Sequence, residues 1–452
     1  MAIGSTLDSY DRTDIGRRRS NNQDSKAVLE PWSREVYKRR GWLFVVADGM
    51  GAHAAGEMAS AIAAEQVPLV YEKLAGRSPA LALRLAIEQA NNEIHSKGES
   101  SVDLKGMGTT CTALALVPRG ALVGHVGDSR AYRVRGRRIE QLTRDHSLVW
   151  ELQDLQAAGE TVPGLDLRET PKNIITRSMG PHPQVQVDLE GPFPVEDGDV
   201  FLLCSDGLSG QVADAEIGLF AGTLPPREAA DALVGLALVR GAPDNITVIV
   251  ARAGAKEASK AAAGDPPWPL TEEPAASAPR PIPWRMLAAA AVSLFAALVA
   301  IGLMPPGFFE GRAENSATLR GAVTLALAGL ALLSFLSTLL FAFWGFLSPP
   351  GPAQRMLAVG AKLGGGPYRS HDCTATVELL DGIAASVETA AEGLDGSPRA
   401  RAEEAARKAR SLAAGGDHRG ATGAAAAAIA VYAAAVEAAR AEATGRQGSA
   451  QA

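Results

Sequence analysis

One short stretch constrains this chain more than any other: an apolar run that ends abruptly in an aspartate and two glycines. Residues 43–47 read Leu-Phe-Val-Val-Ala, and Asp48-Gly49-Met50-Gly51 follow directly. An apolar run of this length predicts a buried strand, and the glycines allow the backbone to turn sharply at its end. A carboxylate fixed at the end of a rigid strand is well placed to bind a hard cation. Because Asp-Gly is also common in ordinary turns, the interpretation depends on what recurs later in the chain.

Length, charge and cysteine content narrow the class of protein. At 452 residues the chain is long enough for more than one domain and a sizeable core. A net charge of −6 and a pI of about 5.8 argue against nucleic acid as a partner. The three cysteines are far apart and match no zinc-binding spacing. No apolar signal-peptide core is present near residue 1, so we expect the front of the chain in the cytoplasm.

The pattern of residues 1–253 predicts one globular domain of the α+β class. Helices are predicted over about 54–74, 78–96 and 227–239. They are grouped between runs of strands instead of alternating with them, which favours two antiparallel sheets packed as a sandwich over a doubly wound parallel sheet. Short apolar runs predict the strands, at 43–47, 109–117, 121–126, 200–204 and 246–251.

The second half of the chain differs in composition from the first. Residues 254–283 are rich in Pro, Ala, Glu and Ser and predict an extended linker. Within 284–347, the stretches 286–304 and 321–347 carry no charge, and each is long enough for a hydrocarbon core that needs roughly 20 residues. We expect a transmembrane helical hairpin there; a pair of buried core helices is the alternative. Residues 348–452 are Ala-rich and predict a cytoplasmic helical tail, partly disordered, with helices over 373–393, 398–414 and 420–444.

Three more aspartates stand at strand junctions like that of Asp48. Asp128 and Asp206 follow apolar runs, and Asp244 directly precedes one. In an antiparallel sheet, strand ends and strand beginnings meet at the same edge, so we expect the four carboxylates to converge there. Such a cluster repels itself and needs cations to neutralise it. Magnesium and manganese suit all-oxygen coordination with retained waters.

Upstream, the segment 17–24 (Arg-Arg-Arg-Ser-Asn-Asn-Gln-Asp) adds a basic group and another acid, Asp24. An arginine fork close to paired cations is well shaped for a phosphate. Two hard cations can activate a water near neutral pH and stabilise the leaving oxygen. Together these groups predict hydrolysis of a phosphate ester.

At this point residues 13–253 resemble the metal-dependent protein phosphatases of type 2C, in their bacterial serine/threonine phosphatase form. The resemblance covers a little over half of the chain and does not extend to the hairpin or the tail. It rests on six short motifs, which occur in order: Arg-Ser-Asn-Asn-Gln-Asp (19–24), Val-Ala-Asp-Gly-Met-Gly (46–51), Gly-Met-Gly-Thr-Thr (106–110), Val-Gly-Asp-Ser-Arg (126–130), Ser-Asp-Gly-Leu (205–208) and Asp-Asn-Ile-Thr (244–247).

The resemblance implies a role for each residue of the predicted site. Asp48 would bridge two Mn²⁺ or Mg²⁺ ions, with the Gly49 carbonyl on one of them, and Asp206 and Asp244 would complete the pair. Asp128 would serve a third, weaker ion together with Asp206. Arg19 would bind the substrate phosphate, and Asp24 would act through waters on the metals. Residues 145–180 would form a flap beside the cleft.

Two positions depart from the family pattern. Gln23 stands where some members have a glutamate ligand, so water would replace that ligand. Met50 stands where animal members carry a histidine proposed as general acid, and His53 lies three residues further on. The identity of the proton donor therefore stays open, with a water on the metals preferred.

Taken together, these features predict a membrane-tethered phosphatase that hydrolyses phosphoserine and phosphothreonine. It would be a multi-pass protein of the inner membrane with a cytoplasmic catalytic domain. Phosphorylated proteins made by a bacterial serine/threonine kinase would be its substrates. The alternative is a catalytically weak adaptor of the same fold that signals through its hairpin and tail.

Overall fold

The computed structural model describes residues 7–51, 55–157, 170–171, 174–258, 284–303, 315–347 and 368–451. The chain divides into two compact units, each described separately below. One contains Met1–Leu270 together with Met356–Ala452, and the other contains Thr271–Arg355.

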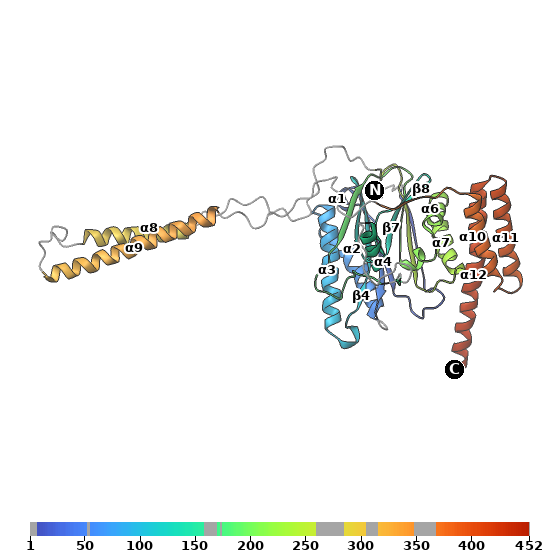
Figure 1. The fold of residues 1–452 in the computed structure, drawn as a ribbon, viewed down its shortest axis with the longest axis horizontal. Helices are drawn as coiled ribbons and strands as arrows, with labels where there is room; N and C mark the ends of the chain where they lie inside the picture. Colours follow the sequence, from blue (N-terminus) through green and yellow to red (C-terminus); the bar gives the residue numbers. More distant parts are fainter. Residues whose placement is uncertain are drawn as a thin grey trace. The chain divides into compact units, whose positions relative to one another are not determined.

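In the described part of the first unit, two antiparallel sheets of six strands pack face to face (Figure 1). The first has the order β1-β11-β10-β7-β8-β12, and the second the order β2-β3-β5-β6-β9, with β4 paired to β3. The first sheet contains β1 (Asp8–Asp14), β7 (Arg130–Arg135), β8 (Arg138–Gln141), β10 (Val200–Cys204), β11 (Ile246–Arg252) and β12 (Ser370–Asp372). The second contains β2 (Asp24–Leu29), β3 (Trp42–Met50), β4 (Gly108–Thr109), β5 (Cys111–Val117), β6 (Gly120–Val126) and β9 (Asp188–Phe193).

Helices cover the outer face of each sheet, which explains why the central strands are apolar throughout. In β3, Phe44 and Val46 face the other sheet, whereas Leu43, Val45 and Ala47 face the helices. Successive side chains of a strand point to opposite faces, so burial of both faces requires an unbroken apolar run. The helices over the second sheet are α2 (Ala55–Lys73) and α3 (Pro79–Glu99); those over the first are α6 (Asp214–Thr223) and α7 (Pro226–Val239).

Shorter elements complete the N-terminal part of this unit. They are α1 (Arg34–Arg40), the 3₁₀ turn Val102–Leu104, α4 (Leu148–Ala157) and α5 (Asp206–Ser209). The predicted fold of two antiparallel sheets flanked by helices is confirmed. All of the predicted strands and helices of residues 1–253 are present, with ends shifted by a few residues.

The C-terminal part of this unit packs against the outside of α7 (Figure 1). It consists of α10 (Val377–Ala391), α11 (Gly396–Ala414) and α12 (His418–Gln451), whose apolar side chains join the same core cluster as α6 and α7. Residues 368–451, which we name the C-terminal module, also supply β12, paired antiparallel with β8. The sequence predicts that residues 348–452 form a separate, partly disordered tail, whereas the described residues 368–451 pack on the sandwich. Alanines at 402, 406, 409 and 413 are fully buried, and their spacing lets the helices approach closely.

The second unit holds two helices, α8 (Trp284–Gly302) and α9 (Asn315–Leu347), which contact each other. Many of their described apolar side chains are exposed: Phe295, Leu330 and Leu333 keep 69%, 65% and 66% of their surface. Among the described residues, the helix segment long and apolar enough to cross a membrane is His418–Ala443 of α12. Half of that segment is buried inside the protein, as in the core helix of a soluble domain. Most of the predicted linker 254–283 lies outside the described residues.

Candidate metal centre

Five aspartates meet at one edge of the sandwich because of how the strands are aligned. Asp24 begins β2 and lies opposite Asp48, near the end of β3. Asp206 follows β10, and Asp244 precedes its partner strand β11. Asp128 lies in the turn between β6 and β7, and Arg130, the first residue of β7, lies opposite Cys204 at the end of β10. The predicted convergence of strand ends and strand beginnings is therefore present.

These carboxyls lie close enough to raise one another's pKa. Burial raises the pKa of Asp48 well above its ordinary value, and the charges of Asp24, Asp206, Asp128 and Asp244 raise it further. Burial also raises the pKa of Asp24 to about 7, against the opposing effect of hydrogen bonds from Thr247 and Ser205. Carboxylates gathered in this way are unfavourable unless protons or cations compensate their charge.

Asp128 and Asp206 behave in the same way. Burial raises the pKa of Asp128 to about 7, with contributions from Asp206 and Asp145. Burial and the charge of Asp244 raise the pKa of Asp206. The Oδ1 atoms of Asp24, Asp128 and Asp206 are buried and have no hydrogen-bond partner among the described residues. Buried oxygens without partners are costly, and a bound cation would satisfy them.

The residues present fit a pair of divalent oxygen-seeking ions. No three histidine, cysteine or acidic side chains of the described residues are arranged to hold an ion by themselves. Magnesium-type sites do not need such a set, because each ion keeps several waters and takes only one or two carboxylates. The convergence of five carboxyls, and the unpartnered buried oxygens of three of them, are the observations that match this chemistry.

The backbone around Asp48 is held firmly from both sides. Its N–H donates to the Thr110 hydroxyl (2.9 Å), and its carbonyl accepts from the Thr109 hydroxyl (2.9 Å) and the Thr110 N–H (2.9 Å). The next residue, Gly49, donates its N–H to the Gln23 carbonyl at 3.0 Å. A Cβ at Gly49 would lie 2.1 Å from the Gly56 carbonyl oxygen, so only glycine fits there.

Arg19 lies at the rim of the cluster and is tied to it. Its Nη2 donates to Asp244 Oδ2 at 2.8 Å, while 47% of its side chain stays exposed. The loop that carries Arg19 is fixed by Asn245, whose side chain donates to the carbonyls of Ile15 and Asn21 (2.9 Å each). Asn245 Oδ1 also accepts the Gln23 N–H at 2.8 Å. The site therefore combines buried acids with one accessible guanidinium.

Comparisons with known proteins agree with this geometry. The family model of protein phosphatase 2C matches residues 16–232. The serine/threonine phosphatase stp of Listeria monocytogenes is 35% identical over 244 residues, which span 53% of this chain and 93% of that protein. The chain belongs to the protein phosphatase 2C family. Protein phosphatase PhpP of Streptococcus pneumoniae is 36% identical over 243 residues, 52% of this chain and 93% of that protein.

Among solved structures, the catalytic domain of the serine/threonine protein phosphatase PstP in complex with two manganese ions is also similar to this chain. It has 35% sequence identity and a TM-score of 0.44, and the match covers 54% of this chain and 97% of that one. The predicted family is confirmed by the relatives, and the residues matched by the family model end at 232, before the second unit and the C-terminal module.

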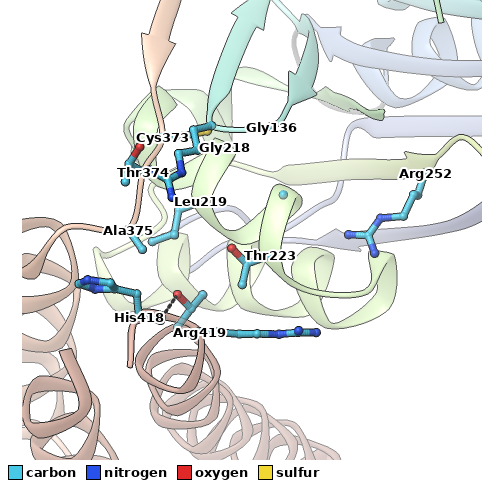
Figure 2. A pocket seen from close by; sticks show the side chains of 13 residues that line it. Gly136, Gly218, Leu219, Thr223, Arg252, Cys373, Thr374, Ala375, His418 and Arg419 are labelled. Atoms are coloured by element: carbon cyan, nitrogen blue, oxygen red, sulfur yellow. Dashed lines mark hydrogen bonds between the residues drawn. The ribbon is translucent and has the colours of Figure 1, made fainter. Parts of the chain in front are cut away.

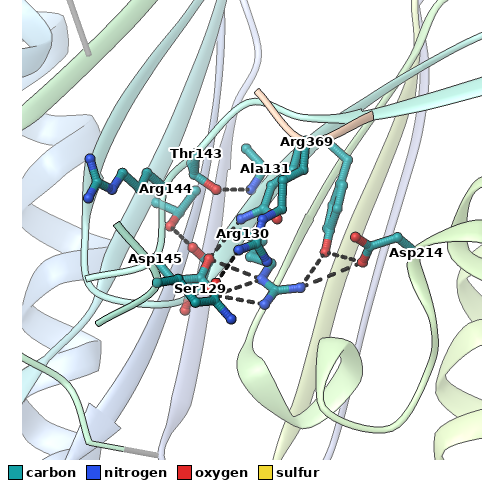
Figure 3. A network of polar contacts seen from close by, with 12 residues as sticks. Ser129, Arg130, Ala131, Thr143, Arg144, Asp145, Asp214 and Arg369 are labelled. Carbon is teal, nitrogen blue, oxygen red and sulfur yellow. Dashed lines mark hydrogen bonds and ion pairs between the residues drawn. The ribbon is translucent and has the colours of Figure 1, made fainter. Parts of the chain in front are cut away.

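A polar network beside this phosphatase 2C site was missed by the sequence analysis (Figure 3). Arg130 binds Asp145 through Nε (3.0 Å to both carboxylate oxygens) and Nη2 (2.7 Å to Oδ2). It also donates to the Tyr132 hydroxyl at 3.1 Å, which in turn donates to Asp214 at 2.9 Å. Arg130 belongs to the motif 126–130, and its place in that motif was the sequence signal that could have pointed to the network. The network holds the turn that carries Asp128.

The predicted flap, residues 145–180, is described only in part. Its first residues are anchored by His146, whose Nε2 contacts Asp188 Oδ2 at 2.9 Å and whose Nδ1 accepts the Gly127 N–H at 2.9 Å. One antiparallel bridge, Ser147–Ile175, pairs the two ends of the segment with each other, and a second, Thr109–Met179, ties its far end to β4. His53 lies outside the described residues.

Proposed function

We propose that this chain is a membrane-tethered phosphatase that hydrolyses phosphoserine and phosphothreonine in proteins at a dinuclear manganese or magnesium centre. The single observation that carries the catalytic part is the convergence of five aspartates at one edge of the sandwich beside one accessible arginine, in a family whose similar members are named serine/threonine phosphatases. Asp48, the Gly49 carbonyl, Asp206 and Asp244 would hold the two ions. Asp128, with Asp206, would hold a third, weaker one.

Bound divalent ions would supply a water activated for attack near neutral pH and would stabilise the leaving oxygen. The chain's own groups bind and orient. Arg19 would bind the substrate phosphate, because its guanidinium is exposed to solvent yet anchored by Asp244. Asp24 would accept hydrogen bonds from waters in the site, and it is held in place by the Ser205 hydroxyl at 2.8 Å.

The test is hydrolysis of p-nitrophenyl phosphate and of a phosphothreonine peptide by the full-length chain in mild detergent, with manganese and with EDTA. We expect manganese-dependent release of phosphate, reduced at least about 100-fold in Asp206→Asn. Asp197, an exposed acid in a turn, is the matched control, and Asp197→Asn should keep full activity. Activity that survives EDTA and Asp206→Asn unchanged contradicts the proposal, and a wild-type chain without any activity favours the adaptor alternative.

The membrane part of the proposal is supported by the second unit. Two apolar helices that expose leucine and phenylalanine side chains to water would be unfavourable, whereas a bilayer would cover them. The segments before and after this unit belong to one compact body, so both must lie on the same side of a membrane. An even number of crossings, as in a hairpin, satisfies that requirement.

Fractionation tests the tether. Full-length protein should stay with the membrane pellet after an alkaline carbonate wash and enter solution only with detergent. Replacement of Leu330 and Leu333 by Lys should release it, because charged side chains at the centre of a span are costly. Quantitative recovery of the unmodified chain in the soluble fraction without detergent would exclude the hairpin.

The proposed partners are phosphoproteins made by a serine/threonine kinase, and confinement to one membrane would raise the local concentration of enzyme near substrates that share it. A comparison of phosphoproteomes with and without this chain tests this. Phosphoserine and phosphothreonine sites should accumulate in its absence, and an unchanged phosphoproteome would argue against the assignment.

A further inference from the structure

The C-terminal module reaches the loop that leads into the candidate metal centre. In α12, Arg440 donates from Nη1 to both Asp14 carboxylate oxygens (3.0 and 3.2 Å) and from Nη2 to the Gly16 carbonyl (2.6 Å). Asp14 ends β1 and is 10% exposed, so its charge is largely removed from water. A buried carboxylate of this kind depends on its cationic partner. Arg440 therefore fixes a segment that is 424 residues away in the chain.

This segment bears directly on Asp244 and Arg19. Gly16 has a φ of +76°, and a Cβ there would lie 2.0 Å from the Asp244 carbonyl oxygen, so the two backbones are in close contact. Asp14 Oδ1 accepts the Gly16 N–H at 2.8 Å and stabilises the turn. Three residues after Gly16 comes Arg19, which pairs with Asp244. The geometry links Arg440 to Arg19 through a short, tightly packed turn.

Arg440 can act in this way because α12 is itself fixed to the sandwich. Ile429 is fully buried and packs against Gly235 of α7, where a Cβ would lie 2.5 Å from its Cγ2. Two polar contacts join the same helix to the N-terminal segment: Arg12 to Glu437 (2.6 Å) and Arg17 to the Tyr432 hydroxyl (2.9 Å). An arginine on a well-packed helix can hold a loop in one position.

The module also contacts helix α4, which lies in the segment predicted as the flap. The Arg369 guanidinium lies 3.5 Å from the centre of the Trp150 ring and donates to Gln153, both on α4 in the flap segment. Its carbonyl accepts the Gln141 N–H at 2.8 Å. Between the module and the sandwich lies a cavity of about 490 Å³ whose walls come from both, including Gly218 and His418 (Figure 2). Arg440 and Arg369 thus join the module to two different segments of the sandwich domain, the turn before Arg19 and helix α4.

We propose that the C-terminal module is an integral part of the catalytic unit, and that Arg440 is a positioning residue that holds Arg19 for phosphate binding through Asp14 and Gly16. This inference rests on the proposed phosphatase function. It assigns a role to a part of the chain outside the region shared with the family relatives.

The experiment measures kcat and KM of the full-length chain in mild detergent with p-nitrophenyl phosphate and manganese, and inhibition by inorganic phosphate. We expect kcat/KM of Arg440→Ala to fall about 10- to 100-fold, mainly through a higher KM and weaker phosphate inhibition. Arg440→Lys keeps a positive charge beside Asp14 but loses the guanidinium that binds Asp14 and Gly16 together. Its kcat/KM should lie between those of the wild type and Arg440→Ala.

The matched control is Arg410→Ala. Arg410 pairs with Asp381 (2.5 Å) and Glu388 (2.7 Å), all within the module, so its loss removes an ion pair without touching the turn before Arg19. It should leave KM unchanged. If wild-type protein lacks activity, the proposed function fails; if wild type is active and Arg440→Ala matches Arg410→Ala, only this inference fails.

A double-mutant cycle separates positioning from a general loss of stability. Because Arg440 acts through Arg19, the double variant Arg19→Ala/Arg440→Ala should be no less active than Arg19→Ala alone. Fully additive losses would overturn the inference. So would a parallel fall of kcat and melting temperature in Arg440→Ala and Arg440→Lys with KM unaltered.

Discussion

At the scale of single residues, Gly16 is a position where the structure leaves no room for a side chain. We expect Gly16→Ala to lower the free energy of unfolding by about 3 kcal/mol, because the added methyl meets the Asp244 carbonyl in a left-handed backbone. Gly198 is the control: its φ is +87° and no atom lies within 4 Å of its Cβ position, so Gly198→Ala should cost only about 1 kcal/mol of strain. Urea unfolding of both variants checks this, and equal losses would contradict it.

A second prediction at this scale concerns pH. Burial lowers the pKa of His125 to about 3, and its Nε2 donates to the Arg144 carbonyl at 3.0 Å. In the unfolded chain a histidine has a pKa of about 6.5, so below that pH the unfolded state takes up a proton that the folded state does not. Stability should therefore fall as pH decreases from 6.5 toward 3, by about 2 kcal/mol between pH 7 and pH 5.

The measurement is the unfolding free energy at pH 7 and at pH 5 for the wild type, His125→Asn and His182→Asn. In His125→Asn, the difference in unfolding free energy between pH 7 and pH 5 should be smaller than in the wild type by about 2 kcal/mol. In His182→Asn, which replaces an exposed histidine, that difference should be unchanged. A wild-type slope in His125→Asn would show that the imidazole is not held neutral in the fold.

How far single residues could be predicted depended on whether a local signal existed. Asp48, Asp128, Asp206 and Asp244 each stand beside an apolar run, so the sequence pointed to them. Arg440 carries no such signal. Its contact with Asp14 joins residues 426 positions apart within an alanine-rich helix, and sequence periodicity contains no information on that pairing.

At the scale of elements, the contact between α7 and α12 yields the next prediction. Ile429→Ala removes a fully buried side chain at this contact and should lower the unfolding free energy by about 3 kcal/mol. Ile429→Val, which removes one methylene, should cost about 1 kcal/mol. Urea unfolding in detergent measures both, and an Ile429→Ala protein as stable as wild type would mean that α12 does not pack on α7.

The same reasoning explains which elements the sequence predicted. Strands buried on both faces, such as β3 and β10, appear as unbroken apolar runs and were predicted. β1, with the sequence Asp-Ser-Tyr-Asp-Arg-Thr-Asp, is an edge strand of its sheet and is partly exposed. Its sequence shows no alternation of apolar and polar residues, so it was not predicted. β12 is exposed and three residues long, and only its pairing with β8 makes it a strand.

At the scale of the whole molecule, the two halves of the compact unit should stay together without a covalent link. Protease sites introduced into 259–283 and 350–367 would excise the second unit from the chain. We expect residues 1–258 and 368–452 to leave the membrane as one soluble complex, because they share a sheet and a core cluster. Gel filtration after cleavage measures this. Separate elution of the two fragments would refute an integral module, and a complex that was never membrane-bound before cleavage would refute the tether.

The central claim is that the aspartates together hold two divalent ions, and calorimetric titration of full-length protein with Mn²⁺ tests it most directly. Without metal, the raised pKa of Asp48 favours its protonated, neutral form. Asp48→Asn should therefore fold normally, and its melting temperature in EDTA should be no lower than that of the wild type. The account predicts two ions bound per wild-type chain, both retained in Asp197→Asn and both lost in Asp48→Asn. Unchanged binding in Asp48→Asn, or none in the wild type, would contradict it.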